Sequence, residues 1–267
     1  MLSDQRQYEI TELICREGRA SIAQLADRFG VSGETVRRDL SVIAKTGKIR
    51  KVHGGAVAVR HPVRDESYAV RQVQSSYNKQ KIGEYAARLL CDGDIIGIDS
   101  GTSAESFARA IYHMRDLKVV TYSIPVATIL ADKLAAGDFE GSVLLLSGTV
   151  NPETHTLGGA VTLTQLQGYH MDKVFVAATA LSASGVMAGT EQDGLMSATL
   201  LRQGELAYVI AESEKLDRQS FFKIADYDEL HGLITDDEHP MSAELAEKIT
   251  ESGAELHTVS LSSHEGV

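Results

Sequence analysis

The chain has 267 residues, of which 43% are hydrophobic and 24% are charged, a composition typical of a soluble globular protein with room for two domains. No run approaches the ~18 apolar residues of a membrane-spanning helix, and the first residues lack the apolar core of a signal peptide. We therefore expect a cytoplasmic protein. Cys15 and Cys91 have neither metal-ligand nor disulfide spacing, and the histidines show no ligand pattern, so neither a metal site nor a cofactor is expected.

The net charge of −11 is unevenly divided along the chain. Residues 1–60 contain 11 Lys and Arg against 7 Asp and Glu, a net charge of +4, whereas the remaining residues carry −15. This asymmetry indicates a small nucleic-acid-binding head joined to an acidic body, whose own field would oppose indiscriminate contact with DNA.

Two short helices are predicted at the N-terminus. Apolar periodicity indicates a helix over residues 4–17. A second helix should follow Ser21, its predicted N-cap, because Ile22, Leu25 and Phe29 then share one face. The glycine turn after this helix leads into a third helix, and this arrangement is typical of a helix-turn-helix motif.

The third helix, residues 33–45, carries the strongest functional signal. Val36 and Leu40 lie on one side, while Arg37 and Arg38 lie on another. Arginine forks match phosphate oxygens or the edge of guanine, so this helix is predicted to bind DNA. The alternative is a solvated helix with two ordinary surface arginines. The predicted contacts on this helix are Ser32, which is also its N-cap, Thr35, Arg37 and Arg38.

The segment after this helix alternates basic and apolar residues and then contains a glycine pair, Gly54 and Gly55. This pattern predicts a two-stranded wing that contacts phosphates, although a solvated hairpin would have the same pattern. The predicted contacts on the wing are Lys48, Arg50, Lys51, His53 and Gly54. We expect the winged head to occupy residues 1–57, with a polar linker at 58–77 in which Pro62 disfavours helix.

The body is expected to occupy residues 78–260, followed by a tail at 261–267. It should begin with a helix over 78–90. An apolar strand at residues 95–98 then leads into Asp99, Ser100, Gly101, Thr102 and Ser103, and a helix follows. Backbone N–H groups, hydroxyls and the positive helix end converge at such a turn, and glycine lets a ligand approach the backbone. The turn therefore indicates an anion site, and the alternative is a turn that merely caps the helix.

Strands and helices then alternate, which predicts an α/β fold with a parallel or mixed sheet covered by helices. Further strands are predicted at 118–121, 143–146, 173–178, 206–211, 230–234 and 255–259, and further helices at 125–136, 194–202 and 243–252. Ligands bind such sheets at the carboxyl ends of the strands. These ends carry Thr121, Tyr122, Ser123, Gly148 and Lys215.

The head resembles the DeoR family of bacterial transcriptional regulators. The resemblance rests on SIAQLA at residues 21–26, VSGETVRRDL at 31–40 and HGGA at 53–56, and the body resembles the family's sensor domain up to about residue 236. It implies a repressor of a sugar or carbohydrate catabolic operon that releases operator DNA when a phosphorylated sugar binds the body. It also implies a sensor domain similar to the ribose-phosphate isomerase and coenzyme A transferase group. Because specific DNA binding generally uses paired half-sites, a homodimer or homotetramer is expected.

The same resemblance assigns pocket residues in the body. The 99–103 turn would hold the phosphate and neighbouring hydroxyls, with Asp99 facing a sugar hydroxyl, and Lys173 and Lys215 would add contacts. The predicted effector contacts are Asp99, Ser100, Gly101, Thr102, Ser103, Thr121, Tyr122, Ser123, Gly148, Lys173 and Lys215. Tyr122 stands where the family usually has Asn, Ser103 where it has a second Thr, and residues 212–215 read ESEK in place of DSSK. Glu66 and Arg71 match an acidic-then-Arg pattern in the family's linker.

An enzyme is the main alternative, namely a sugar-phosphate isomerase with an added head. An isomerase needs a carboxylate beside its substrate to move a proton. Where the isomerases have an acidic pair, this chain has AATA at residues 177–180, although Asp99 and Glu105 remain as candidate bases. A DNA-architectural protein with a ligand-free body would leave the 99–103 turn without a purpose. We therefore favour a regulator over an enzyme.

Overall fold

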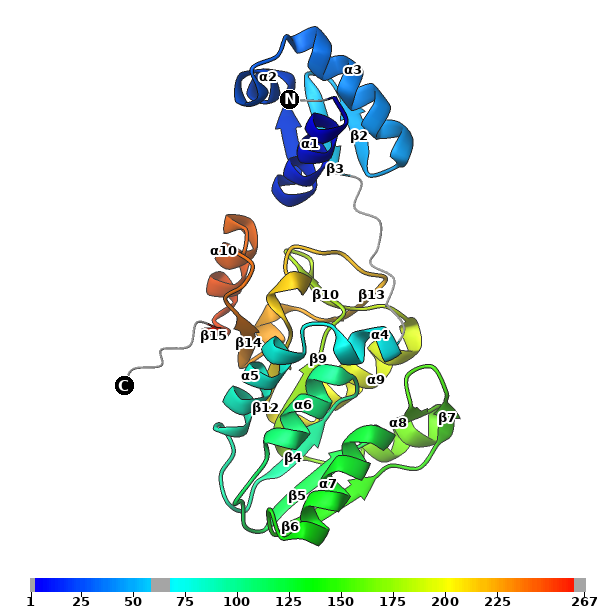
Figure 1. The fold of residues 1–267 in the computed structure, drawn as a ribbon. Helices are drawn as coiled ribbons and strands as arrows, with labels where there is room; N and C mark the ends of the chain where they lie inside the picture. The colour runs from blue at the N-terminus through cyan, green and yellow to red at the C-terminus, as the bar shows by residue number, and fades with distance from the viewer. Residues whose placement is uncertain (1–2, 59–67, 262–267) are drawn as a thin grey trace, which may run out of the picture. The chain divides into compact units, whose positions relative to one another are not determined.

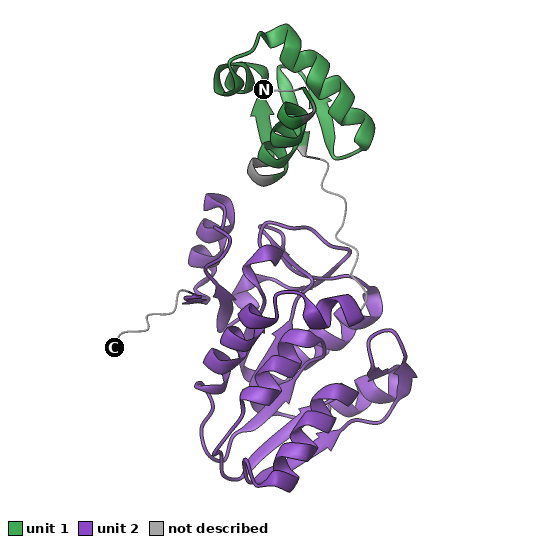
Figure 2. Ribbon diagram, in the orientation of Figure 1, with its two compact units in different colours: residues 1–61 green, residues 62–267 purple. Residues whose placement is uncertain are grey.

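The computed structural model describes residues 3–58 and 68–261 and divides into two compact units, residues 1–61 and 62–267 (Figures 1 and 2). Residues 59–67 of the predicted linker, Glu66 and Pro62 among them, lie outside the described residues, as do residues 262–267 of the predicted tail. Within the described part of the chain, no helix is both long and apolar enough to cross a membrane.

Unit 1 has the three predicted helices and the predicted wing. Its helices are α1 (Ser3–Glu17), α2 (Ile22–Phe29) and α3 (Gly33–Ile43), followed by the 3₁₀ turn η1 (Ala44–Thr46). Its antiparallel strands are β1 (Arg19–Ser21), β2 (Ile49–Val52) and β3 (Gly55–Ala58), in the order β1-β3-β2. The strand β1 was not predicted. The apolar faces of all three helices meet in one core that includes Ile10, Leu25, Val36 and Leu40.

Local sequence sets the ends of these helices. The Ser21 side chain accepts a hydrogen bond from the Gln24 N–H, and the Gln24 side chain accepts one from the Ser21 N–H. These two bonds form a capping box at α2. Gly30 ends α2 in the left-handed region, at φ +63°, which a glycine adopts without strain. Ser32 caps α3 as predicted.

Unit 2 is built on a parallel sheet of seven strands in the order β15-β14-β12-β9-β4-β5-β6. Its strands are β4 (Ile95–Ile98), β5 (Leu117–Thr121), β6 (Gly141–Leu145), β9 (Met171–Ala177), β12 (Gly204–Ile210), β14 (Gly232–Asp236) and β15 (Glu255–Val259). The alternation of strands and helices predicted from the sequence is thus present.

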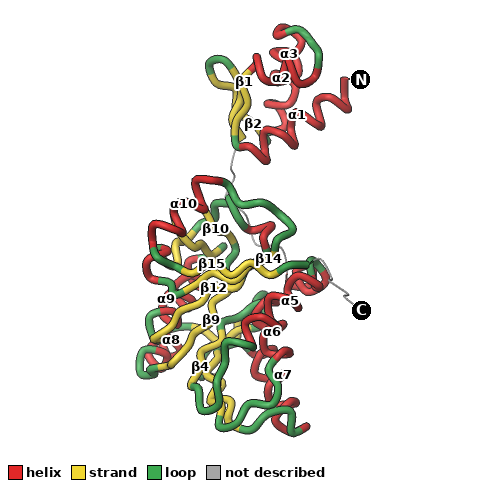
Figure 3. Tube along the Cα trace, turned by 90° about the vertical axis from the view of Figure 1, so that its left-hand side faces the viewer, coloured by secondary structure: helices red, strands yellow, loops and turns green. Residues whose placement is uncertain are grey.

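Helices cover both faces of this sheet (Figure 3). One face is covered by α5 (Ser76–Ala87), α6 (Thr102–Ala110) and α7 (Ile124–Ala136), whose core includes Phe107 and Leu130. The other is covered by α8 (Ala160–Leu166), α9 (Glu191–Leu201) and α10 (Ala243–Ser252), whose core includes Leu200 and Leu233. The unit is therefore a three-layer α/β/α fold.

The linker prediction was too long. The helix α4 (Tyr68–Val73) and the first two residues of α5 lie inside the predicted 58–77 linker and belong to unit 2. Two contacts hold α4 in place: the Tyr68 hydroxyl donates to the Glu105 carboxylate at 2.6 Å, and Lys79 Nζ donates to the Arg71 carbonyl oxygen at 2.6 Å.

Several short elements were also not predicted. They are the hairpin of β7 (Thr149–Asn151) and β8 (Thr156–Gly158), the small sheet of β10 (Ala180–Ser182), β11 (Gly185–Ala188) and β13 (Phe222–Ala225), and the 3₁₀ turns η2 (Ser213–Lys215) and η3 (Tyr227–Glu229).

The order of the strands determines where a ligand pocket should lie. From β4 the sheet grows through β5 to β6, whereas from β9 it grows in the opposite direction through β12, β14 and β15. Helices that follow β4 and β9 therefore leave a crevice at the carboxyl ends of these two strands, and such switch points are the usual ligand sites of open α/β sheets.

Candidate nucleic-acid interface and ligand pocket

The exposed face of α3 carries both predicted arginines. Ser32 Oγ accepts a hydrogen bond from the Thr35 N–H at 3.2 Å, which fixes the start of the helix. The side chains of Arg37 and Arg38 are 58% and 82% exposed. One carboxylate oxygen of Glu34 lies 3.3 Å from the Arg37 guanidinium, and the other lies 3.9 Å from that of Arg38. Such exposed pairs are weak, so both guanidinium groups are available to an external anion.

The aspartate that follows the two arginines has a structural role. Asp39 is buried, and its carboxylate accepts hydrogen bonds from Arg6 Nε at 2.7 Å and from Gln7 Nε2 at 2.8 Å. Both partners lie on α1, so this contact fixes the rotation of α3 and directs Arg37 and Arg38 outward.

The wing has the predicted exposure. The tips of β2 and β3 are joined by His53 and Gly54, and Gly54 has a φ of +81°. The predicted contacts on the wing, Lys48, Arg50, Lys51, His53 and Gly54, are all exposed. Lys51 Nζ donates to Ser41 Oγ at 2.8 Å, which connects the wing to α3.

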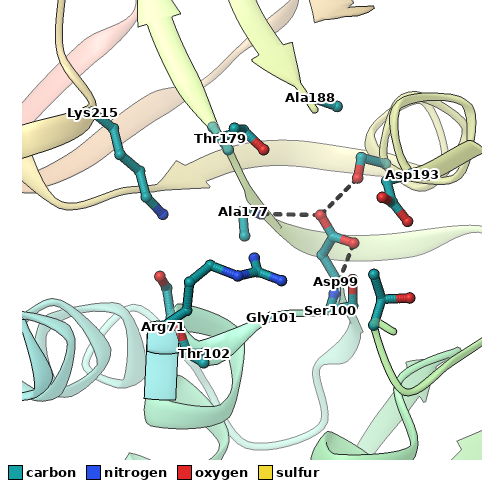
Figure 4. A pocket seen from close by; sticks show the side chains of 14 residues that line it. Arg71, Asp99, Ser100, Gly101, Thr102, Ala177, Thr179, Ala188, Asp193 and Lys215 are labelled. Atoms are coloured by element: carbon teal, nitrogen blue, oxygen red, sulfur yellow. Dashed lines mark hydrogen bonds between the residues drawn. The ribbon is translucent and has the colours of Figure 1, made fainter. Parts of the chain in front are cut away.

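The body has a pocket at the switch point between β4 and β9 (Figure 4). Its cavity has a volume of about 50 Å³, which is enough for a small polar group since a single water needs ~10–15 Å³. Of the predicted effector contacts, Asp99, Ser100, Gly101, Thr102, Ser103 and Lys215 line it. The lining residues that sequence analysis missed are Arg71, Thr154, Ala177, Ala178, Thr179, Ala188, Asp193 and Ser197.

The N-terminus of α6 forms one wall of the pocket. Gly101 stands at the N-cap with a φ of +97°, a conformation that favours glycine, and no side chain caps this helix. The first intrahelical bond of this turn runs from the Glu105 N–H to the Gly101 carbonyl, so the N–H groups of residues 102–104 have no partner within the helix. Helix N–H groups placed in this way favour an anion.

Asp99 supports the pocket wall and is already fully hydrogen-bonded. One carboxylate oxygen accepts from the Ser100 N–H and the Tyr122 hydroxyl, and the other from the Ala177 N–H and the Ser197 hydroxyl. Four donors fill the acceptor sites of a carboxylate, so the predicted contact of Asp99 with a sugar hydroxyl is not supported. Burial raises the pKa of Asp99 to about 6, although these donors oppose the shift.

The predicted contacts after β5 do not line the pocket. Tyr122 is buried and reaches Asp99 from the core. The hydroxyl of Thr121 accepts from the Ser123 N–H at 3.1 Å, and that of Ser123 caps α7 by accepting from the Val126 N–H at 3.4 Å. The side chains of all three residues are therefore used within the fold.

Two further effector predictions also lie away from the lining. Lys173 is the third residue of β9, near the amino end of the sheet, where its Nζ lies 2.6 Å from an Asp94 carboxylate oxygen. Gly148 permits close packing, because a Cβ there would lie 2.1 Å from Thr162 Oγ1. We therefore remove Lys173, Gly148, Thr121, Tyr122 and Ser123 from the set of direct contacts.

A buried carboxylate connects the pocket to three other elements. Glu212 lies 3.2 Å from Lys79 Nζ on α5 and 2.8 Å from Lys215 Nζ on η2, and it accepts from Ser103 Oγ on α6 at 3.1 Å. Burial would raise the pKa of Glu212, but Lys215 and Lys79 outweigh it and lower this pKa to about 2. The ionised Glu212 therefore fixes the position of the Lys215 ammonium group at the pocket.

Arg71 is the most informative residue that sequence analysis left outside the pocket. It projects from α4 toward the 99–103 turn, and its Nη1 lies 3.9 Å from the position that a Cβ would take on Gly101 (Figure 4). Its Nε is buried without a hydrogen-bond partner among the described residues. Buried donors are almost always paired, so this N–H group is available to a ligand. The only signal in the sequence is the acidic-then-Arg pattern, which the family resemblance places in a linker.

Comparison with protein families matches both units. Residues 6–61 match the model of the DeoR-like helix-turn-helix domain, and residues 74–237 match that of the DeoR C terminal sensor domain. The chain belongs to the DeoR family. Both family assignments made from the sequence are thereby confirmed, and so is the combination of a winged head with an α/β sensor domain.

Relatives of this DeoR-family chain are named as regulators. It is 30% identical to the transcriptional repressor GlcR of Bacillus subtilis, over 88% of this chain and 89% of that protein. It is 28% identical to the lactose phosphotransferase system repressor of Streptococcus mutans, over 94% and 99% of the two chains. The chain is therefore a DNA-binding transcriptional regulator, and the enzyme alternative is set aside.

Solved structures similar to this DeoR-family chain are more distant in sequence. The sorbitol operon regulator SorC of Klebsiella pneumoniae is 14% identical, over 89% of this chain and 97% of that chain, with a TM-score of 0.39. Ribose 5-phosphate isomerase A of Methanocaldococcus jannaschii is 15% identical, over 52% and 53% of the two chains, with a TM-score of 0.36.

Proposed function

We propose that this regulator represses a sugar or carbohydrate catabolic operon and that a phosphorylated sugar, bound in the pocket between β4 and β9, controls its binding to operator DNA. The observation that carries the proposal is the convergence of Arg71, Lys215 and the N-terminus of α6 on one small cavity. One relative is named as a repressor of a lactose phosphotransferase system, which supports the sugar class.

The cationic side of the pocket suits a phosphate group. Lys215 and Arg71 enter the pocket from one side (Figure 4), and both line the cavity together with Thr102. An arginine fork, an ammonium group and helix N–H groups are three donor types that bind phosphate oxygens. We assign the phosphate of the ligand to this side.

The opposite side of the pocket suits sugar hydroxyls. Asp99 and Asp193 lie across the pocket from Lys215 (Figure 4). A carboxylate would repel phosphate, whereas hydroxyl groups donate hydrogen bonds to carboxylates. We assign the sugar to this side, with Asp193 and Thr179 as contacts and with Asp99 as a support for the wall.

Calorimetry on the full chain tests the pocket. Titration with pentose and hexose phosphates, with the matching free sugars and with inorganic phosphate identifies the ligand class. Arg71→Met should lower the affinity of the cognate sugar phosphate by about 10- to 100-fold, because it removes charge-assisted hydrogen bonds. Lys118→Met, which removes an exposed lysine from β5, is the matched control and should bind like the parent. Equal affinity of parent and Arg71→Met would exclude this pocket as the effector site.

A second experiment tests the connection to DNA. Thr102→Asp places a carboxylate at the N-terminus of α6 and should abolish the response to the sugar phosphate while operator binding persists, because the head is a separate unit. Operator binding is followed by fluorescence anisotropy with and without ligand. Linkage requires that DNA change the affinity for the ligand by the same factor as the ligand changes the affinity for DNA. A Thr102→Asp protein that still responds like the parent would place the effector elsewhere.

A further inference from the structure

The two edges of the seven-stranded sheet differ in exposure and charge. Within the described residues, β6 has a strand neighbour on one side only, as does β15 at the other edge. Four of the five β6 residues are exposed, including Leu144 at 43% and Leu145 at 38%. Large apolar side chains on both sides of an edge strand favour contact with another protein surface.

Hydrogen bonding shows which backbone groups of β6 face outward. The Leu146 N–H donates to the Thr121 carbonyl, and the Glu140 carbonyl accepts from the Leu117 N–H, so even-numbered residues of this segment bond to β5. Backbone groups alternate in direction along a strand, and the N–H and C=O groups of Val143 and Leu145 therefore point away from the sheet. They are positioned to bond to one further strand.

The free part of this edge is short. At Ser147, the next outward-facing residue, the N–H donates to Gln165 Oε1 at 2.8 Å and the carbonyl accepts from Thr162 Oγ1 at 2.8 Å. Both partners lie on α8, which therefore closes the edge after β6. An added strand is thus limited to the span of Gly141–Leu145.

The β6 edge also lacks charge. Residues 141–151 contain no charged side chain, although residues 61–267 carry a net charge of −15. The β15 edge, by contrast, carries Glu255 and His257 beside the exposed Leu256. Charged side chains on an edge oppose pairing with another strand. Two acidic copies of the chain would repel one another least where their surfaces are uncharged.

We propose that β6 pairs with β6 of a second copy of this chain, in antiparallel orientation about a two-fold axis. A strand that meets its own copy antiparallel uses the same surface twice, which is the geometry of an isologous dimer. The choice of a second copy as the partner rests on the proposed function, because operator recognition by such heads generally uses paired half-sites. The pairing satisfies the outward backbone groups of Val143 and Leu145 and covers Leu144.

Sedimentation equilibrium of the full chain without DNA tests this interface. The parent is expected to be an oligomer. Leu144→Glu brings two like charges together at the axis and should raise the dissociation constant by at least about tenfold. Val143→Pro removes an outward N–H that β5 does not use, so unit 2 should remain folded while pairing is lost. Leu256→Glu, at the other edge of the same sheet, is the control and should keep the parent mass.

Several outcomes would overturn the proposal: a monomeric parent, a parent mass retained by both β6 variants, or equal dissociation by Leu256→Glu. Circular dichroism melting checks that each variant is folded, and Val143→Pro is decisive if Leu144→Glu fails this check. Binding to a single half-site is measured separately. A β6 variant that is monomeric but still binds one half-site retains its DNA-binding function, so failure of the interface and failure of the proposed function can be distinguished.

Discussion

Replacing Tyr122 with Phe should destabilise unit 2 by an amount that depends on pH. The Tyr122 hydroxyl is one of the four donors to the buried Asp99 carboxylate, and the variant removes that donor without changing the shape of the ring. Because hydrogen bonds to charged groups are stronger than those to neutral groups, the cost depends on whether Asp99 is ionised.

The expected magnitudes follow from the pKa of Asp99, which burial raises to about 6 in the folded protein from ~3.9 in an unfolded chain. The folded state thus binds the Asp99 proton more tightly. The contribution of this group to the free energy of unfolding should therefore fall by about 3 kcal/mol as the pH rises from about 4 to about 6. At about pH 8, where Asp99 is ionised, Tyr122→Phe should cost about 1.5–3 kcal/mol, and at about pH 5 only about 0.5–1.5 kcal/mol.

Urea unfolding followed by far-UV circular dichroism measures these costs on the transition of unit 2. Tyr227→Phe is a matched control, because Tyr227 is equally buried and its hydroxyl donates to the neutral Ser182 carbonyl at 3.0 Å. Its cost should be about 1 kcal/mol at both pH values. The reasoning would be refuted if the cost of Tyr122→Phe were the same at both pH values, or at about pH 8 no larger than that of the control.

Three predictions concern the head. Arg37→Ala and Arg38→Ala should each weaken operator binding, and a base contact would cost about 1–3 kcal/mol of discrimination when operator and scrambled DNA are titrated in parallel. Arg50→Ala should flatten the dependence of log affinity on log salt by about one unit or less, and an unchanged slope would argue against a phosphate contact. Gly55→Ala should destabilise the head in a melting experiment, because its Cβ would lie 2.2 Å from the Ala20 carbonyl oxygen, and an unchanged melting temperature would contradict this packing.

The head was largely predictable because its signals are local. The Ser32 cap, the apolar face of Val36 and Leu40, and the glycine turns are each set within a few residues. The strand β1 was missed because its three residues form a strand only by pairing with β3, where Arg19 lies opposite Val57. Nothing in the sequence near Arg19 indicates that partner.

The pocket was predicted only in part, because only part of it is determined by local sequence. The 99–103 turn is local, since a strand, a glycine and a helix follow one another directly along the chain. Arg71 and Lys173 depend on tertiary placement: α4 docks on α6 and brings Arg71 in, while Lys173 lies near the amino end of β9, away from the pocket. The Asp99–Tyr122 contact joins two strand ends whose pairing the sequence did not specify.

The docking of α4 also limits how the pocket can control the head. Ten peptide units separate Ala58, the last residue of β3, from Tyr68, the first residue of α4, and they span at most ~35 Å. Release of α4 up to Ser75 would raise this number to 17 units, and for a flexible chain such an increase lowers the effective concentration of an attached group by only about twofold. That factor corresponds to about 0.5 kcal/mol. If the proposed effector changes operator affinity by more than this, we expect the change to come from how the second units of the proposed oligomer are arranged, because a longer connection alone has too small an effect.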